Sequence, residues 1–213
     1  MNPHGFLPRA GEPLRDSMTR QRTPEREAKI RHVLGWRQKD LSLVLANIHD
    51  PHNVSAIYRS CDAFGVPRVH LYYTRTAFPS LGEKSSASAR KWVESVRHSS
   101  LESLKAALTA GNMRIYATSC SPGARPLGDF DFTKPSAVIM GNEHGGVDPE
   151  LLALADAELY IPMYGMIQSF NVSVAAAVIL AEASRQRVAA GNYEFPTFEA
   201  AELEELTANW LKK

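Results

Sequence analysis

Short apolar runs alternate with segments of helical periodicity along most of this chain of 213 residues. Apolar runs of about four to eight residues bounded by turn residues are typical of strands buried on both faces, and intervening helices make such strands parallel. The alternation predicts an α/β fold with a largely parallel sheet flanked by helices. The expected strands are 41–48, 66–73, 114–118, 137–140 and 158–162, and the expected helices are 55–64, 101–110, 149–155 and 169–190.

Two further helices are expected outside this alternating region. Thr23 and Pro24 have the form of an N-cap followed by proline at the first helical position, which predicts a basic amphipathic helix over 24–38. Hydrophobic periodicity predicts a last helix over 198–211. The Pro- and Gly-containing segment 1–22 is expected to lack fixed structure. The predicted organisation is an arm over 1–22, a basic helix within 23–40, a central domain over 41–192 and a helical extension over 193–213.

The formal net charge of +1 conceals an uneven distribution of charge. The first 40 residues contain nine Lys/Arg and five Asp/Glu, so a basic arm precedes a mildly acidic body. Such an arm is typical of proteins that bind polyanions, and solubility alone is the alternative explanation. The longest apolar stretch, 172–183, is interrupted by Ser173 and Glu182 and is too short to cross a bilayer. We therefore expect a cytoplasmic protein without membrane contact.

The two cysteines predict neither a metal site nor a disulfide. Cys61 and Cys120 do not have the spacing of metal ligands. They fall in an expected helix and an expected strand, so buried thiols are the simpler interpretation. No metal site is predicted for this chain.

The first candidate loop covers residues 47–55, between an expected strand and an expected helix. In parallel α/β sheets, ligands bind outside the carboxyl ends of the strands, where this loop lies. Asn53 suits a binding role there, and capping of the following helix is its structural alternative. Arg59 and Asp62 are three residues apart on that helix, so an ion pair on a solvated face is one explanation of both.

Two more loops follow strands at the same expected edge. Loop 141–148 contains three glycines around Glu143, which allow the backbone to approach a ligand closely, but it matches neither a dinucleotide fingerprint nor a Walker loop. Loop 161–171 is apolar, and Ser169 is expected to cap the helix that follows. Apolar walls with free backbone groups suit an adenine and a thioether better than a phosphate. The residues alone therefore predict an α/β enzyme with a small-molecule pocket and a basic arm.

These three loops, in this order, resemble the three motifs of the SpoU/TrmH branch of the SPOUT methyltransferases. The matching segments are 53–59 (Asn-Val-Ser-Ala-Ile-Tyr-Arg), 139–146 (Ile-Met-Gly-Asn-Glu-His-Gly-Gly) and 161–177, from Ile-Pro-Met through Ser-Phe-Asn-Val-Ser-Val-Ala-Ala-Ala. The resemblance extends over roughly residues 24–213. It implies a SPOUT fold, in which the C-terminal segment threads through a loop to form a deep trefoil knot. It also implies an obligate homodimer in which residues of both subunits complete each site.

Within this branch, the chain looks most like the tRNA guanosine 2′-O-methyltransferases. Segments 37–41, 185–187 and 210–212 are similar to that group. The resemblance implies transfer of a methyl group from S-adenosyl-L-methionine to a ribose 2′-hydroxyl of tRNA, specifically guanosine 18 of the D-loop, leaving S-adenosyl-L-homocysteine. A ribosomal RNA target and an anticodon-loop nucleotide are the nearest alternatives. A non-catalytic RNA-binding protein of the same fold is a more distant one.

The resemblance also carries roles for five polar residues. Arg59 is expected to orient the 2′-hydroxyl and stabilise its developing charge, because a guanidinium with a pKa above about 12 is poorly suited to act as a general base. Asn53 is expected to hold Arg59 or the substrate ribose. Glu143, Ser169 and Asn171 are expected to support the site.

Cofactor and RNA contacts are carried over in the same way. The cofactor is expected to contact Gly141, Ile161, Met166 and Ser169, mostly through their backbone groups. The RNA is expected to be bound through phosphate contacts, which make affinity strongly dependent on salt. The residues expected to make these contacts are Arg26, Arg31, Arg37, Lys91, Arg185 and Arg187.

Overall fold

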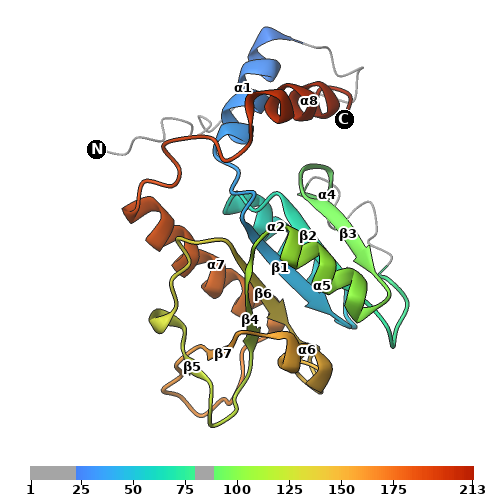
Figure 1. Cartoon of the computed structure of the whole chain (residues 1–213), viewed down its shortest axis with the longest axis vertical. Coiled ribbons are helices and arrows are strands. Elements are labelled where there is room, and N and C mark those ends of the chain that lie inside the picture. Colours follow the sequence, from blue (N-terminus) through green and yellow to red (C-terminus); the bar gives the residue numbers. More distant parts are fainter. Residues whose placement is uncertain (1–22, 80–88) are drawn as a thin grey trace, which may run out of the picture.

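A parallel sheet of seven strands forms the centre of the computed structural model, which describes residues 23–79 and 89–213 (Figure 1). The strand order is β3-β2-β1-β6-β4-β7-β5, and each neighbouring pair is parallel. The predicted arm over 1–22 lies outside the described residues. The strands are β1 Leu41–Ala46, β2 Arg68–Tyr72, β3 Glu94–His98, β4 Arg114–Thr118, β5 Arg125–Pro126, β6 Ser136–Met140 and β7 Ala157–Tyr160.

Helices cover both faces of this sheet, as expected for buried parallel strands. Along β1, Leu43 and Leu45 pack into the core beneath α2 and α7, whereas Val44 and Ala46 pack into the core beneath α5 and α6. This alternation follows from the two-residue period of a strand. The helices are α1 Pro24–Gly35, α2 Pro51–Ala63, α4 Ala89–Trp92, α5 Leu101–Ala110, the short 3-10 helix η1 Leu127–Asp129, α6 Pro149–Leu154, α7 Val172–Ala189 and α8 Ala200–Trp210.

The architecture confirms the predicted α/β class. The strand at the centre of the sheet, β6, comes late in the chain. β6 lies between β1 and β4, both of which precede it in sequence. The paired residues of β1 and β6 include Leu41 with Ser136 and Leu45 with Met140. The trefoil knot stays a prediction.

Two helix starts differ from the sequence prediction. α2 begins at Pro51 and is capped by Asp50, whose side chain accepts a hydrogen bond from the backbone N of His52. α7 is capped by Asn171, so the predicted cap at Ser169 is wrong. Neither Asn53 nor Ser169 caps a helix, so capping explains neither residue.

The terminal helices α1 and α8 pack on each other at one end of the molecule (Figure 1). Ile30 and Leu34 of α1 form a small apolar cluster with Trp210 of α8. The exposed Arg31 and Glu204 connect the same two helices, with a closest N–O distance of 2.6 Å. The helical extensions at the two ends of the described chain therefore form one structural unit.

The two cysteines differ in their exposure. Cys61 is buried, but Cys120 is exposed, so the prediction of two buried thiols is wrong for Cys120. None of the helices in the described ranges is long and apolar enough to cross a membrane. Within the same ranges, no group of three or more His, Cys, Asp or Glu side chains is arranged to hold a metal ion.

Candidate active site

The three motif loops meet at the carboxyl edge of the sheet. Loops 47–50 and 141–148 follow the adjacent strands β1 and β6, and loop 161–171 connects β7 to α7. This is the edge where open α/β sheets bind their ligands. The topology therefore brings together segments that are about 90 to 120 residues apart in the chain.

A chain of side-chain hydrogen bonds joins one residue from each motif. The Nδ2 atom of Asn53 donates to Oε1 of Glu143 at 2.7 Å, and the Nδ2 atom of Asn171 donates to Oδ1 of Asn53 at 3.0 Å. Asn171 also accepts from the backbone N of Ser173 at 2.9 Å, which fixes it at the start of α7. Asn53 is buried, and its amide is held between these two partners. The sequence predicted all three residues, and the structure brings them together.

The carboxylate of Glu143 accepts the hydrogen bonds at one end of this row of side chains. Burial raises its pKa, but hydrogen bonds from Asn53 and from backbone N–H groups, including that of His49, outweigh this effect and lower the pKa below its ordinary value. The backbone N of His49 lies 3.3 Å from Oε2 of Glu143. An ionised carboxylate accepts hydrogen bonds but is a weak base when its pKa is lowered. Glu143 is thus suited to hold Asn53 in place and poorly suited to remove a proton.

A second connection between the first two loops was missed by the sequence analysis. Asn47, directly after β1, donates from Nδ2 to Oδ2 of Asp148 at 3.1 Å, and both side chains are buried. Asn47 has a φ of 49°, a left-handed conformation that asparagine tolerates better than most residues. An asparagine directly after a buried strand was the available signal, but its partner is about 100 residues away.

Loop 141–148 is folded tightly back on itself. The backbone groups of Asn142 and Gly146 exchange two hydrogen bonds of 3.0 and 3.2 Å. A Cβ atom on Gly141 would lie 2.1 Å from the carbonyl carbon of Gly146, so no side chain fits at residue 141. Gly146 has a φ of 68°, which favours glycine. Gly141 and Gly146 are therefore required by the turn that presents Glu143.

The third loop has the opposite character, because it is open. None of residues 162–170 is hydrogen-bonded to any residue that the structure describes. Tyr164 and Met166 are 98% and 100% exposed, and Ile167 and Phe170 are exposed as well. Unpaired backbone groups beside apolar side chains fit a ligand that combines an adenine with a thioether. Of the four expected cofactor contacts, Gly141 is buried, Ile161 is half-buried, and Met166 and Ser169 are exposed.

Arg59 and Ser169 stand apart from the Glu143–Asn53–Asn171 chain. Both are exposed, and neither side chain forms a hydrogen bond or ion pair with the described residues. Asp62, which could have paired with Arg59, is paired with Arg37 instead. The alternative explanation of Arg59 as half of a surface ion pair with Asp62 therefore does not hold.

Two of the six expected RNA contacts are buried inside the protein. Arg37 is 1% exposed and Arg187 is 0% exposed. The Arg37 guanidinium donates to Asp62 and to the carbonyl oxygen of Val66. That of Arg187 donates to Asp40 at 2.6 Å and to other oxygens nearby. Their assignment as RNA contacts is wrong, because charge in the sequence was interpreted without burial.

The other four expected RNA contacts remain accessible to different degrees. Arg31 and Arg185 are exposed and paired with glutamates, namely Glu27 and Glu204 for Arg31 and Glu182 for Arg185. Lys91 is exposed and Arg26 is half-buried. The two pairs partly neutralise these arginines, so their attraction for a polyanion is weaker than their number suggests.

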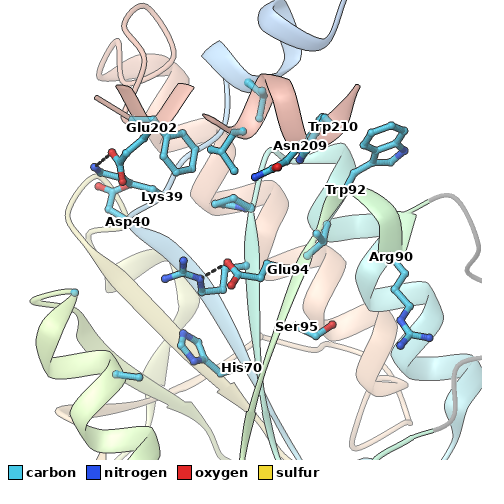
Figure 2. Close-up of a pocket in the computed structure, with 18 of the residues that line it drawn as sticks. Lys39, Asp40, His70, Arg90, Trp92, Glu94, Ser95, Glu202, Asn209 and Trp210 are labelled. Carbon is cyan, nitrogen blue, oxygen red and sulfur yellow. Dashed lines mark hydrogen bonds and ion pairs between the residues drawn. The ribbon is translucent and has the colours of Figure 1, made fainter. Parts of the chain in front are cut away.

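A cavity of about 800 Å³ lies at the amino end of the sheet, away from the motif loops (Figure 2). Arg68 is paired with Glu94 there, and Lys39 with Glu202, each at 2.8 Å. Its basic side chains are thus largely balanced by acids, and none of the three motifs reaches it. The chemistry expected from the motifs therefore belongs to the opposite edge.

The fold and the loop cluster define an α/β protein whose candidate active site lies at the carboxyl edge of a parallel sheet. Residues 40–181 match the model of the SpoU rRNA methylase family, so the chain belongs to this family. It is 45% identical over 194 residues to the tRNA (guanosine(18)-2′-O)-methyltransferase of Thermus thermophilus, covering 91% of this chain and all of that protein.

Solved structures agree with this assignment. The TrmH/SpoU tRNA modifying enzyme of A. aeolicus superposes with a TM-score of 0.82 at 36% identity, covering 88% of this chain and 95% of that one. The SpoU methyltransferase AviRb of Streptomyces viridochromogenes, in complex with the cofactor AdoMet, superposes with a TM-score of 0.65 at 28% identity. That match covers 71% of this chain and 62% of AviRb.

Proposed function

We propose that this chain is a cytoplasmic S-adenosylmethionine-dependent methyltransferase that modifies the ribose 2′-hydroxyl of guanosine 18 in the D-loop of tRNA. The observation that carries the proposal is the hydrogen-bonded chain Glu143–Asn53–Asn171, which unites all three motif loops at one edge of the sheet. The similarity to the Thermus thermophilus enzyme over its full length supports the choice of substrate.

Loops 141–148 and 161–171 would hold the cofactor. Gly141 lets the backbone of Gly146 come close and so shapes the first of these loops, and Ile161, Met166 and Ser169 would supply backbone groups and apolar surface. S-adenosylmethionine, when bound, supplies a methyl group made electrophilic by its sulfonium. The unpaired backbone groups of 162–170 and the exposed apolar side chains beside them fit this molecule.

The residues of this chain contribute chiefly by positioning. Methyl transfer requires the 2′-oxygen, the methyl carbon and the sulfur in line, and correct orientation supplies much of the rate. The amide of Asn53 is held by Glu143 and Asn171, and it presents its second N–H and the second lone pair of its oxygen to the substrate. Arg59 orients the 2′-hydroxyl and stabilises the charge that develops on its oxygen. A neighbouring phosphate of the RNA accepts the proton.

The functional unit is a homodimer in which the subunits complete each other's sites. Large exposed apolar side chains gather around the start of α7. Monomeric soluble proteins rarely expose such a patch, so its presence supports burial against a second copy. The side chains of this patch are Tyr160, Tyr164, Met166, Ile167, Phe170 and Val174. Sedimentation of the purified protein tests this directly, and a single monomeric species at micromolar concentration would contradict it.

The test of the function is mapping of 2′-O-methyl groups in tRNA and ribosomal RNA transcripts after incubation with the protein and S-adenosylmethionine. We expect methylation of the D-loop guanosine by the wild type and none by Arg59→Ala. Methylation at another nucleotide would overturn the substrate and retain the chemistry. Absence of methylation in every RNA would overturn the enzyme activity and favour an RNA-binding role.

A further inference from the structure

An exposed guanidinium is held in a fixed position beside the candidate active site. Arg75 lies just beyond the carboxyl end of β2, and its side chain is 64% exposed. Its Nη1 atom lies 3.0 Å from Oδ1 of Asp148, whose side chain is only 8% exposed. Asp148 directly follows the loop that carries Glu143, so Arg75 belongs to the same edge of the sheet as the motif loops.

Asn47 binds both the backbone of Arg75 and Asp148, the carboxylate partner of Arg75. Oδ1 of Asn47 accepts hydrogen bonds from the backbone N atoms of Thr74 and Arg75, at 3.1 and 3.2 Å. Nδ2 of the same side chain donates to the second oxygen of Asp148 at 3.1 Å. Arg75 is therefore restrained both at its backbone and at its guanidinium, so little conformational entropy remains to be lost on binding.

The pairing of Arg75 differs from that of the exposed arginines in the helices. Arg185 directs two nitrogens to both oxygens of Glu182, and Arg31 is shared between two glutamates. Arg75 uses only Nη1, and its other guanidinium nitrogens have no partner among residues 23–79 and 89–213. A guanidinium has five N–H donors, so Arg75 retains enough of them to bind a planar pair of oxygens.

We propose that Arg75 binds a backbone phosphate of the RNA close to the methylated nucleotide, with Asn47 and Asp148 as its positioning residues. The inference rests on the proposed function, because it requires an RNA at this edge. Phosphate contacts of this kind set the register of a nucleic acid without reading its sequence. Asn47 and Asp148 then have a second effect, since their hydrogen bond also ties the end of loop 141–148, which presents Glu143, to the loop after β1.

The experiment compares Asp148→Asn with the double variant Asp148→Asn/Arg75→Gln. Both lack the buried carboxylate, which would otherwise lose its cationic partner and keep only the hydrogen bond from Asn47 when Arg75 is removed, and they differ only in the guanidinium. Affinity for a tRNA transcript is measured as a function of salt concentration, together with affinity for S-adenosylmethionine. We expect roughly fivefold to tenfold weaker RNA binding by the double variant than by Asp148→Asn, and a salt slope reduced by about 0.7–0.9. Cofactor affinity should be equal in the two.

Arg68→Gln is the matched control, because Arg68 is an exposed, carboxylate-paired arginine at the opposite end of the same strand. It should leave the salt slope unchanged. Arg75→Lys provides a second test, because lysine keeps the positive charge but lacks the planar pair of N–H donors. It should lower RNA affinity and leave the salt dependence of binding unchanged.

The outcomes separate this inference from the proposed function. If the wild type methylates tRNA and the paired variants bind RNA with equal affinity and slope, Arg75 is not a phosphate contact and its pair with Asp148 is only structural. An equal loss in Arg68→Gln would also overturn the inference, because any surface arginine would then suffice. A wild type that neither binds nor methylates tRNA overturns both.

Discussion

At the amino end of the sheet, Arg187 is buried and donates to the side chains of Gln38 and Asp40 and to three backbone carbonyls. At the carboxyl end, residues 162–170 have no hydrogen bond to any other described residue. In the first region, polar groups join α7 to the segments that precede β1 and β6. In the second, the polar groups of the backbone have no partner among the described residues. We therefore expect substitutions in the first region to reduce stability, and substitutions at the carboxyl end to reduce activity more than stability.

Arg187→Met gives the strongest test of this contrast. Removing a fully buried guanidinium leaves Asp40 and the carbonyls around it without a partner, so we expect a loss of about 3–5 kcal/mol in the free energy of unfolding. Urea denaturation measures it. Arg185→Met, two residues away on the exposed side of α7, should cost less than about 0.5 kcal/mol. Similar losses in the two variants would break the comparison.

Asn53→Ala should have the reverse signature, with a large effect on rate and a small one on stability. It removes the residue that connects Glu143 to Asn171, and misplacement of this kind costs about 100-fold in rate, or roughly 2.7 kcal/mol in activation free energy. Single-turnover methylation of tRNA measures the rate, and thermal denaturation the stability. Asn209→Ala on α8 is the control, for which we expect an unchanged rate. A rate loss explained entirely by unfolding would contradict the assignment of Asn53 to the site.

A buried histidine pair on β2 and β3 should make the stability of the fold sensitive to acid. Nδ1 of His70 lies 2.9 Å from Nε2 of His98, and burial, with the nearby charges of His98 and Arg68, lowers the pKa of His70 to about 4. The folded state then binds fewer protons than the unfolded state between pH 6.5 and about 4, so stability present above pH 6.5 is lost as the pH falls through this range.

The loss from this pair should be on the order of 2 kcal/mol, measured by urea denaturation at a series of pH values. His70→Gln should flatten the profile between pH 6.5 and pH 4 because it removes the titrating group. An unchanged profile in this variant would assign the acid sensitivity to other residues.

Arg31→Ala should have the smallest effect, although it breaks contacts to two glutamates. Arg31, Glu27 and Glu204 are all exposed, so the expected loss is below about 0.5 kcal/mol and should decrease further with added salt. Thermal denaturation at low and high salt measures it. A loss above about 1 kcal/mol would mean that surface charge, and not the apolar cluster of Ile30, Leu34 and Trp210, fixes α8 to α1.

The sequence predicted the sheet and the site to different extents, for physical reasons. Buried parallel strands such as β1 are apolar throughout and were found, whereas the edge strand β3 has exposed polar residues on most of its length and was missed. The start of α2 was placed too late, although Asp50-Pro51 repeats the cap pattern that was used correctly at Thr23-Pro24.

The motif residues Asn53, Glu143 and Asn171 were predicted as a set and are found bonded to one another. The pairing of Asn47 with Asp148, and the burial of Arg37 and Arg187, were not foreseen. They depend on which distant segments meet, and local pattern and composition carry no information about that. The roles of Arg59 and Ser169 rest on the resemblance, because within one subunit neither is bonded to the others.

The packing of α1 on α8 has a consequence for the order of events during synthesis. α1 leaves the ribosome early, but its apolar partner Trp210 is made at the far end of the chain. At translation speeds of about 5–20 residues per second, Ile30 and Leu34 wait roughly 10–30 s before they can be covered. During that interval the nascent chain carries an uncovered apolar surface, which makes it a substrate for chaperones that bind such surfaces.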